Sequence, residues 1–304
     1  MKYLILILLF LGSHAIRLCG QTILPTPDYL EKANGQLQLQ GKIRMHTQDA
    51  SASFLHLFYE KLIPKSAVEW CSEKGHSQIS WEKDATLPAE GYRILVTPEK
   101  MTVRAADNAG FIYAVQSLRQ WGTREGDKLI FPCAEITDFP RVKWRSFMLD
   151  SGRQYQKVST IKKYIDMASM LKMNYFHWHL TEGLGWRIEI KRYPLLTRIG
   201  AFVGQGPEQQ GFYSQEEVKE IVSYAADLGI TVVPEIDMPG HAEAALNSYP
   251  RLGCFNIPVK VPQSGFTQNI FCAGKDSTLT FLQNVLDEVC RMFPSAYIHL
   301  GGDE

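Results

Sequence analysis

The sequence has no excess of charge of one sign. Its 304 residues include 32 Lys and Arg and 32 Asp and Glu, so the formal net charge is +0. Nucleic-acid-binding domains usually carry a basic patch or stripe, and charged tails carry runs of one sign. Neither pattern occurs here, which argues against a nucleic acid as partner. With 45% hydrophobic residues, a chain of this length can bury a sizeable core and is predicted to hold two domains.

The sequence also lacks an apolar run long enough to span a bilayer at its N-terminus. Residues 3–11 form an apolar run of nine residues there, whereas a membrane-spanning helix needs about 20. The run follows Lys2 and precedes small residues at Ala15 and Gly20, a pattern typical of a secretory signal. We therefore predict a signal peptide over residues 1–20, no stable membrane span, and export to the periplasm or the extracellular space.

Six cysteines are present, but none of them form a Cys-x-x-Cys pair, the spacing typical of cysteine metal sites. Metal binding by these cysteines is therefore not expected. Export permits disulfides, and the candidate is a Cys254–Cys272 bridge that closes one loop, with buried free thiols as the alternative for the others. Cys19 could instead carry a lipid, although bulky Leu18 stands where a lipoprotein signal has a small residue.

Residues 21–140 mix strand and helix patterns and are predicted to form a small α+β domain. Tyr92–Val96 and Met101–Ala105 flank Thr-Pro-Glu-Lys, which predicts a β-hairpin. Asp107 can cap a helix that Gly122 ends. No catalytic cluster is evident in this region of the sequence, so the chemistry is expected beyond it.

Strand and helix patterns alternate over residues 141–304, which predicts βα units and a parallel sheet. The expected strands are Arg145–Asp150, Asn174–Leu180, Thr231–Ile236 and Tyr297–Leu300, and the expected helices are Lys157–Met173, Ser214–Leu228 and Asp276–Met292. Each strand ends in polar or charged residues, as strands do at the active face of a TIM-type barrel. A complete barrel takes roughly 250 residues, whereas this stretch supplies 164 residues and about four units.

The predicted fold class is therefore α/β, a small N-terminal α+β domain followed by a (β/α)8 TIM-type barrel truncated after about four strands. An open half-barrel exposes two strand edges and its inner face, which is an aggregation hazard. We accordingly expect the chain to be a fragment of a longer enzyme.

Polar residues at the first two predicted strand ends offer several kinds of site. Asp150 and Arg153 follow the first strand, where the guanidinium can bridge two sugar hydroxyls or simply form a structural ion pair with the aspartate. His177 and His179 share one face of the second strand. They can bind a metal, hold carboxylates in place or belong to the core.

Carboxylates are concentrated at the other two strand ends. Glu235 and Asp237 alternate along the third strand, and His241 can hydrogen-bond an acid just beyond the turn. Such carboxylates are costly inside an apolar strand unless they are paired, which favours a functional role. Asp303 and Glu304 follow two glycines after the last strand. Cleavage of a glycosidic bond needs one protonated acid and one charged neighbour, and an ordinary acidic turn is the alternative.

Taken together, these clusters resemble glycoside hydrolase family 20, the β-N-acetylhexosaminidases. Four segments match that family's pattern in order: Trp144-Arg145…Asp150-x-x-Arg153, His177-Trp178-His179-Leu180-Thr181, Pro234-Glu235-Ile236-Asp237-Met238-Pro239-Gly240-His241 and His299-x-Gly301-Gly302-Asp303-Glu304. Residues 91–140 resemble the end of the family's N-terminal domain. The resemblance covers nearly all of the chain after the predicted signal.

The resemblance implies hydrolysis of terminal non-reducing N-acetylhexosamine residues from β-glycosides, so the partners would be glycans containing N-acetylglucosamine or N-acetylgalactosamine. It implies a retaining mechanism in which the substrate's own acetamido oxygen attacks the anomeric carbon, without cofactor or metal. By position, Asp303 would hold the acetamido N–H and Glu304 would protonate the leaving oxygen and then activate water. Arg153 with Asp150 would bind sugar hydroxyls. The supporting residues would be His179, Glu182, Asp237, His241 and His299.

The sequence departs from the family's pattern after His-Leu-Thr, where Glu182-Gly183 stand in place of the usual two aspartates or aspartate with another polar residue. Two other functions stay open. One is a catalytically inactive sugar-binding remnant, if translation ends at Glu304. The other is a metal-dependent barrel hydrolase using His177, His179 and Asp303.

Overall fold

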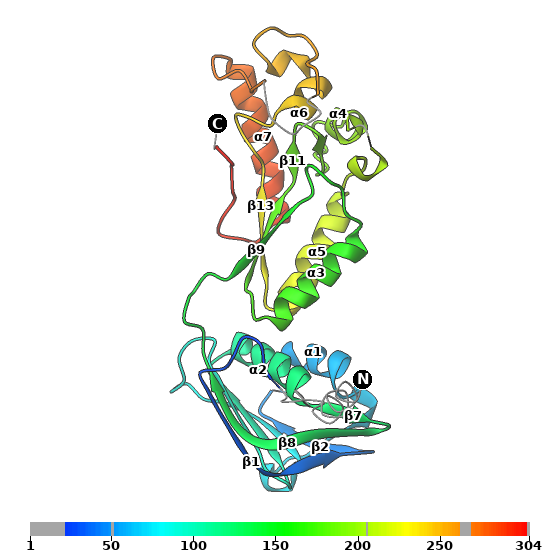
Figure 1. Cartoon of the computed structure of the whole chain (residues 1–304). Helices are drawn as coiled ribbons and strands as arrows, with labels where there is room; N and C mark the ends of the chain where they lie inside the picture. The colour runs from blue at the N-terminus through cyan, green and yellow to red at the C-terminus, as the bar shows by residue number, and fades with distance from the viewer. Residues whose placement is uncertain (1–21, 50–51, 205, 262–268, 303–304) are drawn as a thin grey trace, which may run out of the picture.

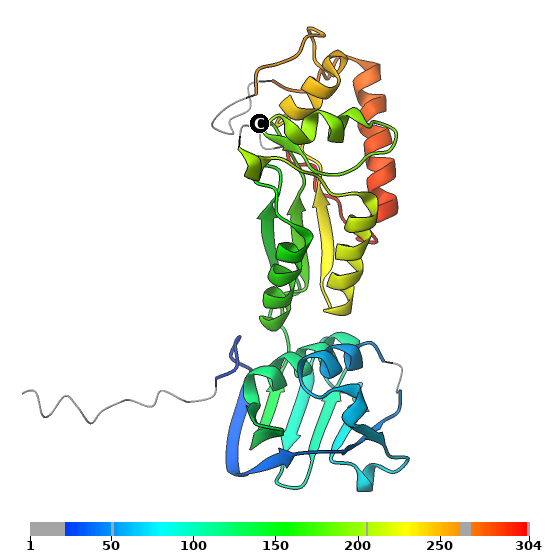
Figure 2. The same ribbon diagram turned by 90° about the vertical axis from the view of Figure 1, so that its right-hand side faces the viewer.

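The computed structural model describes residues 22–49, 52–204, 206–261 and 269–302, which form a lower sheet domain and an upper, incomplete barrel (Figures 1 and 2). The predicted signal peptide lies outside the described residues. None of the helices in the described part of the chain is long and apolar enough to cross a membrane.

The N-terminal domain is one twisted sheet with helices on one face. Its strands run in the order β1-β8-β5-β6-β4-β2-β3, and β7 pairs with β8. The strand bounds are β1 Tyr29–Leu39, β2 Ile43–Thr47, β3 Val68–Trp70, β4 Ile79–Lys83, β5 Tyr92–Val96, β6 Met101–Ala105, β7 Thr123–Glu125 and β8 Lys128–Asp138. Helices α1 (Phe54–Lys61) and α2 (Asn108–Trp121) cover the face turned toward the barrel (Figure 1).

Local sequence explains the centre of this domain. Strands β5 and β6 form the predicted antiparallel hairpin, and every second residue of β5 is buried against the helices. Helix α2 begins where the Asp107 carboxylate accepts a hydrogen bond from the Gly110 N–H, and its C-cap is Gly122. The predicted hairpin and helix are thus confirmed. A capping carboxylate typically stabilises a helix by about 1 kcal/mol.

The barrel part holds three parallel strands in the order β13-β10-β9. Their bounds are β9 Ser146–Asp150, β10 Tyr175–His179 and β13 Thr231–Glu235. Beyond β10, two short strands of two residues each, β11 Thr181–Glu182 and β12 Gly185–Trp186, form an antiparallel hairpin. The helices are α3 Val158–Met170, α4 Leu195–Arg198, α5 Gln215–Asp227, α6 Glu243–Ser248 and α7 Asp276–Met292. Helices α3, α5 and α7 lie outside the strands, as the βα pattern predicted (Figures 1 and 2).

The predicted fourth strand, Tyr297–Leu300, is largely wrong. Only His299 makes a bridge, a parallel one with Glu235. The segment still lies along β13, because the His299 N–H donates to the Pro234 carbonyl at 2.9 Å and its carbonyl accepts from the Ile236 N–H at 3.0 Å. Positive φ angles at Gly301 and Gly302 end the extended run immediately afterwards, so no longer ladder forms among the described residues.

The loop after α6 is joined to the segment that precedes α7 by a disulfide. Cys254 and Cys272 form this bond with their Cα atoms 5.0 Å apart, which is the pairing considered from the sequence. In the described residues Cys71, Cys133 and Cys290 are free thiols.

A buried ion pair joins the two domains. Helix α3 ends at Met170, earlier than predicted, because Lys172 adopts a left-handed conformation (φ 59°) and turns toward the sheet domain. Its ammonium donates to the Asp138 carboxylate at 2.7 Å and to the Tyr92 hydroxyl at 2.8 Å. Burial lowers the pKa of Lys172, and the charge of Asp138 opposes that shift. Removing one partner of such a pair leaves an uncompensated buried charge, which destabilises the folded state.

We therefore expect Lys172→Met to lower the free energy of unfolding by about 3 kcal/mol, because Asp138 would lose its buried cation. Urea unfolding measures the change. The matched control is Lys162→Met on helix α3. The Lys162–Glu220 ion pair, at 2.6 Å, is more exposed and should contribute less than about 1 kcal/mol to the free energy of unfolding. Equal stability of the two variants would contradict the role given to Lys172.

Candidate active site

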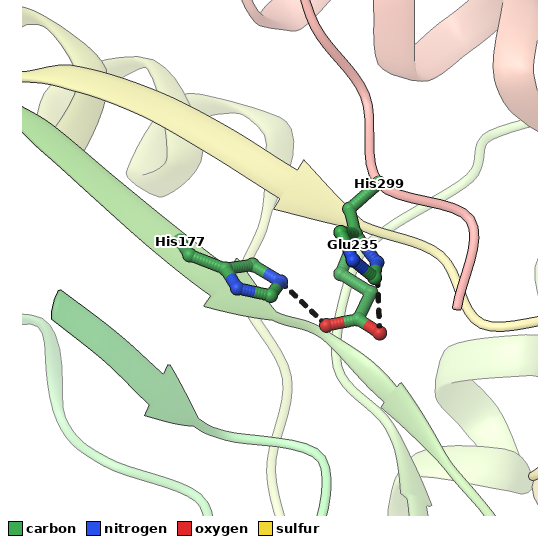
Figure 3. Close-up of side chains that lie close together, drawn as sticks. All are labelled: His177, Glu235 and His299. Atoms are coloured by element: carbon green, nitrogen blue, oxygen red, sulfur yellow. Dashed lines mark hydrogen bonds and ion pairs between the residues drawn. The ribbon is translucent and has the colours of Figure 1, made fainter. Parts of the chain in front are cut away.

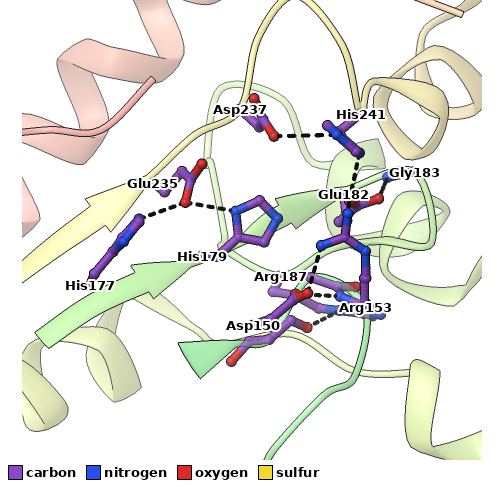
Figure 4. Close-up of polar contacts among 12 residues, drawn as sticks. Asp150, Arg153, His177, His179, Glu182, Gly183, Arg187, Glu235, Asp237 and His241 are labelled. Carbon is purple, nitrogen blue, oxygen red and sulfur yellow. Dashed lines mark hydrogen bonds and ion pairs between the residues drawn. The ribbon is translucent and has the colours of Figure 1, made fainter. Parts of the chain in front are cut away.

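Polar side chains from three parallel strands meet at one edge of the barrel (Figure 4). Asp150 ends β9, His179 ends β10 and Glu235 ends β13, and the register pairs His179 with both of the others. Parallel strands present their carboxyl ends at the same edge, so residues far apart in sequence come together without any special loop. The predicted clusters are therefore neighbours in space.

Arg153 links two carboxylates at this edge. Its guanidinium Nη1 lies 2.7 Å from Asp150 Oδ2, and its Nη2 lies 2.5 Å from Glu182 Oε1. The Arg153 backbone N–H also donates to Asp150 Oδ1 at 2.8 Å, which fixes the turn that carries the side chain. The Arg153 side chain remains 42% exposed, so it has N–H groups available for a ligand.

Glu182 is the most deeply buried acid of the site, with a side chain 0% exposed. Its Oε1 contacts His241 Nδ1 at 2.5 Å, and its Oε2 accepts from the Gly183 N–H at 2.6 Å. Burial raises the pKa of Glu182, while the charges of Arg153 and His241 partly offset that rise. The residue at which the sequence departs from the family's pattern therefore contacts His241.

His241 continues the chain of contacts to Asp237. Its Nε2 lies 3.9 Å from Asp237 Oδ2, and the Asp237 N–H donates to the Thr181 hydroxyl at 2.8 Å. Both side chains are buried. Acid and base groups thus alternate from Asp150 to Asp237 across the carboxyl ends of β9, β10 and β13 (Figure 4). Such a chain can orient a proton donor and hold its charge.

Glu235 is surrounded by three histidines (Figure 3 shows two of them). Its Oε2 lies 2.6 Å from His177 Nε2 and 2.8 Å from His179 Nδ1, and its Oε1 lies 3.2 Å from His299 Nδ1. Burial by itself would raise the pKa of Glu235, but hydrogen bonds and charge from His177 and His179 outweigh it and lower the pKa. Glu235 is therefore a carboxylate held in the ionised form.

The segment that follows His299 is seated against Asp237. A Cβ atom added at Gly301 would collide with the Asp237 carboxylate, and Gly301 also has φ +66°. The Met238 N–H donates to the Leu300 carbonyl at 2.9 Å on the same stretch. Only glycine permits this approach. Asp303 and Glu304, the predicted catalytic pair, lie outside the described residues.

Arg187 is an important residue that the sequence reasoning missed. Its side chain is fully buried and donates to the carbonyl oxygens of Ser151, Gly152 and Ala201 at 2.8–2.9 Å. It therefore holds the turn between Asp150 and Arg153 in place. Burial lowers the pKa of Arg187 to about 10. The available signal was an arginine between the apolar residues of Leu-Gly-Trp-Arg-Ile.

Comparison with protein families matches both parts of the chain. The family model described as "Glycosyl hydrolase family 20, domain 2" matches residues 20–139. The model described as "Glycosyl hydrolase family 20, catalytic domain" matches residues 142–304. Together they cover all of the described residues except the junction.

Individual proteins that are similar to this chain bear names consistent with the same family. A β-N-acetylhexosaminidase structure from Bacteroides fragilis is 80% identical with a TM-score of 0.89, over 94% of this chain and 57% of that chain. The Streptomyces plicatus N-acetyl-β-hexosaminidase in complex with thio-NAglucal is 32% identical with a TM-score of 0.85, over 93% of this chain and 59% of that chain. A β-hexosaminidase of Porphyromonas gingivalis is 39% identical over 303 residues, which are 94% of this chain and 39% of that protein.

The seating of the last described segment gives a direct test. Gly301→Ala should release that segment from β13, because the new methyl group cannot coexist with the Asp237 carboxylate. Hydrogen exchange measured by NMR should then show faster exchange of the Met238, Ile236 and His299 amides.

The matched control is Gly41→Ala. Gly41 has nearly the same φ, +67°, but nothing within 4 Å of an added Cβ. It should therefore show only the general cost of a left-handed alanine, about 1 kcal/mol, with no change in those three amides. Unchanged amide exchange in Gly301→Ala would show that the contact with Asp237 does not hold the segment.

Proposed function

Because the chain belongs to glycosyl hydrolase family 20, we propose that it is part of an enzyme that hydrolyses terminal β-linked N-acetylhexosamine residues of glycans. The chain spans 39% to 59% of the length of the three relatives described above, so this activity is assigned to the protein that contains the complete barrel. Those relatives bear the names β-hexosaminidase and β-N-acetylhexosaminidase, which supports the same substrate class here.

One observation carries the proposal: the continuous polar chain from Asp150 through Arg153, Glu182 and His241 to Asp237 at the carboxyl edge of the barrel (Figure 4). Arg153 is half-exposed and tied to two carboxylates, so its remaining N–H groups have a fixed direction toward sugar hydroxyls. Donors that are already fixed lose little further side-chain entropy when they bind a hydroxylated ring.

For the chemical step we propose the retaining, substrate-assisted route. The acetamido oxygen of the substrate attacks the anomeric carbon while Glu304 protonates the leaving oxygen, and the same residue then removes a proton from the attacking water. Asp303 accepts a hydrogen bond from the acetamido N–H and stabilises the positive oxazolinium. His241, held between Glu182 and Asp237, supplies the adjoining electrostatic support.

We also propose that the protein is exported. The support is the sequence of residues 1–20 together with the Cys254–Cys272 disulfide, since such bonds persist in oxidising compartments. N-terminal sequencing of the protein from the culture medium or periplasm should find a chain that begins after Ala15 or Gly20. An uncut N-terminus in the cytoplasm would overturn this assignment.

The catalytic assignment is tested by Glu304→Gln in the protein encoded by the complete gene. With N,N′-diacetylchitobiose, whose leaving group needs a proton, turnover should fall by about 10²–10⁴-fold. Binding of N-acetylglucosamine, measured by calorimetry, should be kept, because the amide preserves the shape of the side chain.

The matched control is Glu125→Gln on β7 of the sheet domain, where the residue is exposed and turnover should not change. Turnover of Glu304→Gln equal to that of the control would remove Glu304 from the mechanism. Proton NMR of the first product adds a second check, since a retaining enzyme must release the β-anomer first.

A further inference from the structure

Three side chains on the inner face of the barrel strands form a second cluster beside the polar chain described above. His177 lies on β10, Glu235 ends β13, and His299 lies on the segment next to β13 (Figure 3). One ligand atom from each lies within 4.8 Å of the others. We propose that His177, Glu235 and His299 form a binding site for a divalent transition-metal cation of the zinc class.

The donor set defines the class of cation. Two imidazole nitrogens and one carboxylate oxygen are a set that Zn²⁺ accepts in four-coordinate sites, where water or another ligand completes the coordination. Mg²⁺ and Ca²⁺ require mostly oxygen ligands, so this cluster should discriminate against them. The two imidazole rings are already close, with centroids 4.6 Å apart.

The hydrogen bonds of His299 provide a separate argument for a cation. Its Nδ1 accepts from the Gly301 N–H at 3.0 Å, so this nitrogen presents a lone pair rather than a proton. The same Nδ1 lies only 3.2 Å from Glu235 Oε1, which is also an acceptor. Two acceptors at this distance repel each other unless a proton or a metal cation lies between them. A metal ion bound here takes the Nδ1 lone pair in place of the Gly301 N–H and balances the charge of the Glu235 carboxylate.

Access and anchoring also suit a metal site. In the 304-residue chain the His299 side chain is 49% exposed and that of His177 is 23% exposed, so an ion can reach the cluster of this chain from solvent. The Glu235 side chain is only 7% exposed and has a second histidine, His179, at 2.8 Å from Oε2. In ordered metal sites, neighbouring side chains hydrogen-bond to the ligands and fix their orientation. His179 does this for the Glu235 carboxylate.

A competing set shares the same carboxylate. His179, Glu235 and Asp237 also bring ligand atoms within 4.8 Å, but all three residues are buried. Asp237 belongs to the polar chain from Asp150 to Asp237, which serves the proposed hydrolysis, and His179 is paired in register with Asp150 of the same chain. The more exposed trio with His177 and His299 is therefore the better entry point for an ion, and its proposal does not rest on the hydrolytic function.

The test is zinc binding to the 304-residue chain after removal of its predicted signal, by competition with a chromophoric chelator about one pH unit above the ordinary pKa of histidine. We expect one zinc ion per chain. His177→Gln and His299→Gln should each weaken binding by about 100-fold or more, because each removes a direct ligand. The matched control, His56→Gln at an exposed position of α1, should bind as the unaltered chain does.

Cobalt absorption and circular dichroism complete the experiment. Co²⁺ should give the visible spectrum of a four-coordinate site in the unaltered chain and lose it in His299→Gln, while far-ultraviolet circular dichroism shows that the variant is folded. Excess Mg²⁺ should not displace zinc. The proposal is overturned if folded His177→Gln and His299→Gln bind zinc as tightly as the control, or if only His179→Gln abolishes binding.

Discussion

Two buried carboxylates, Glu182 and Glu235, hold most of the charged and histidine side chains at the barrel edge. An ionised carboxylate is costly to bury unless a cation or several hydrogen-bond donors lie against it. Glu182 meets this requirement through Arg153 and His241, and Glu235 meets it through the surrounding histidines. The two solutions differ in outcome, because burial raises the pKa of the first carboxyl while its partners lower the pKa of the second.

The sequence was sufficient for the fold class and for much of the site. The periods of the apolar residues predict the hairpin β5–β6, helix α2 and the alternating βα units, and the structure contains the hairpin, the helix and three parallel strands with their helices. The candidate site could be located because parallel strands end at one edge, so polar residues after each strand must be neighbours. The family comparison agrees with the resemblance carried by those strand-end motifs.

What the sequence could not predict depends on contacts between distant segments. Arg187 is indistinguishable by period from a surface arginine, yet it donates to carbonyl groups from three separate segments of the chain. The fourth strand was overestimated because its glycines turn the chain as soon as Asp237 is reached. Likewise, helix α3 ends earlier than predicted, and Lys172 beyond its end forms an ion pair with Asp138 of the sheet domain. Each case is a tertiary contact that overrides a local pattern.

The segment that contains His299 is hydrogen-bonded to β13 and to the residues that follow it. Glu235 contacts His299 and Asp237 contacts Gly301, so two acids one residue apart fix two successive points of that segment. Asp237 is also the residue that His241 contacts, and His241 contacts Glu182, which Arg153 binds. The same few side chains therefore position both the groups proposed to bind sugar and the segment that leads to the proposed acid.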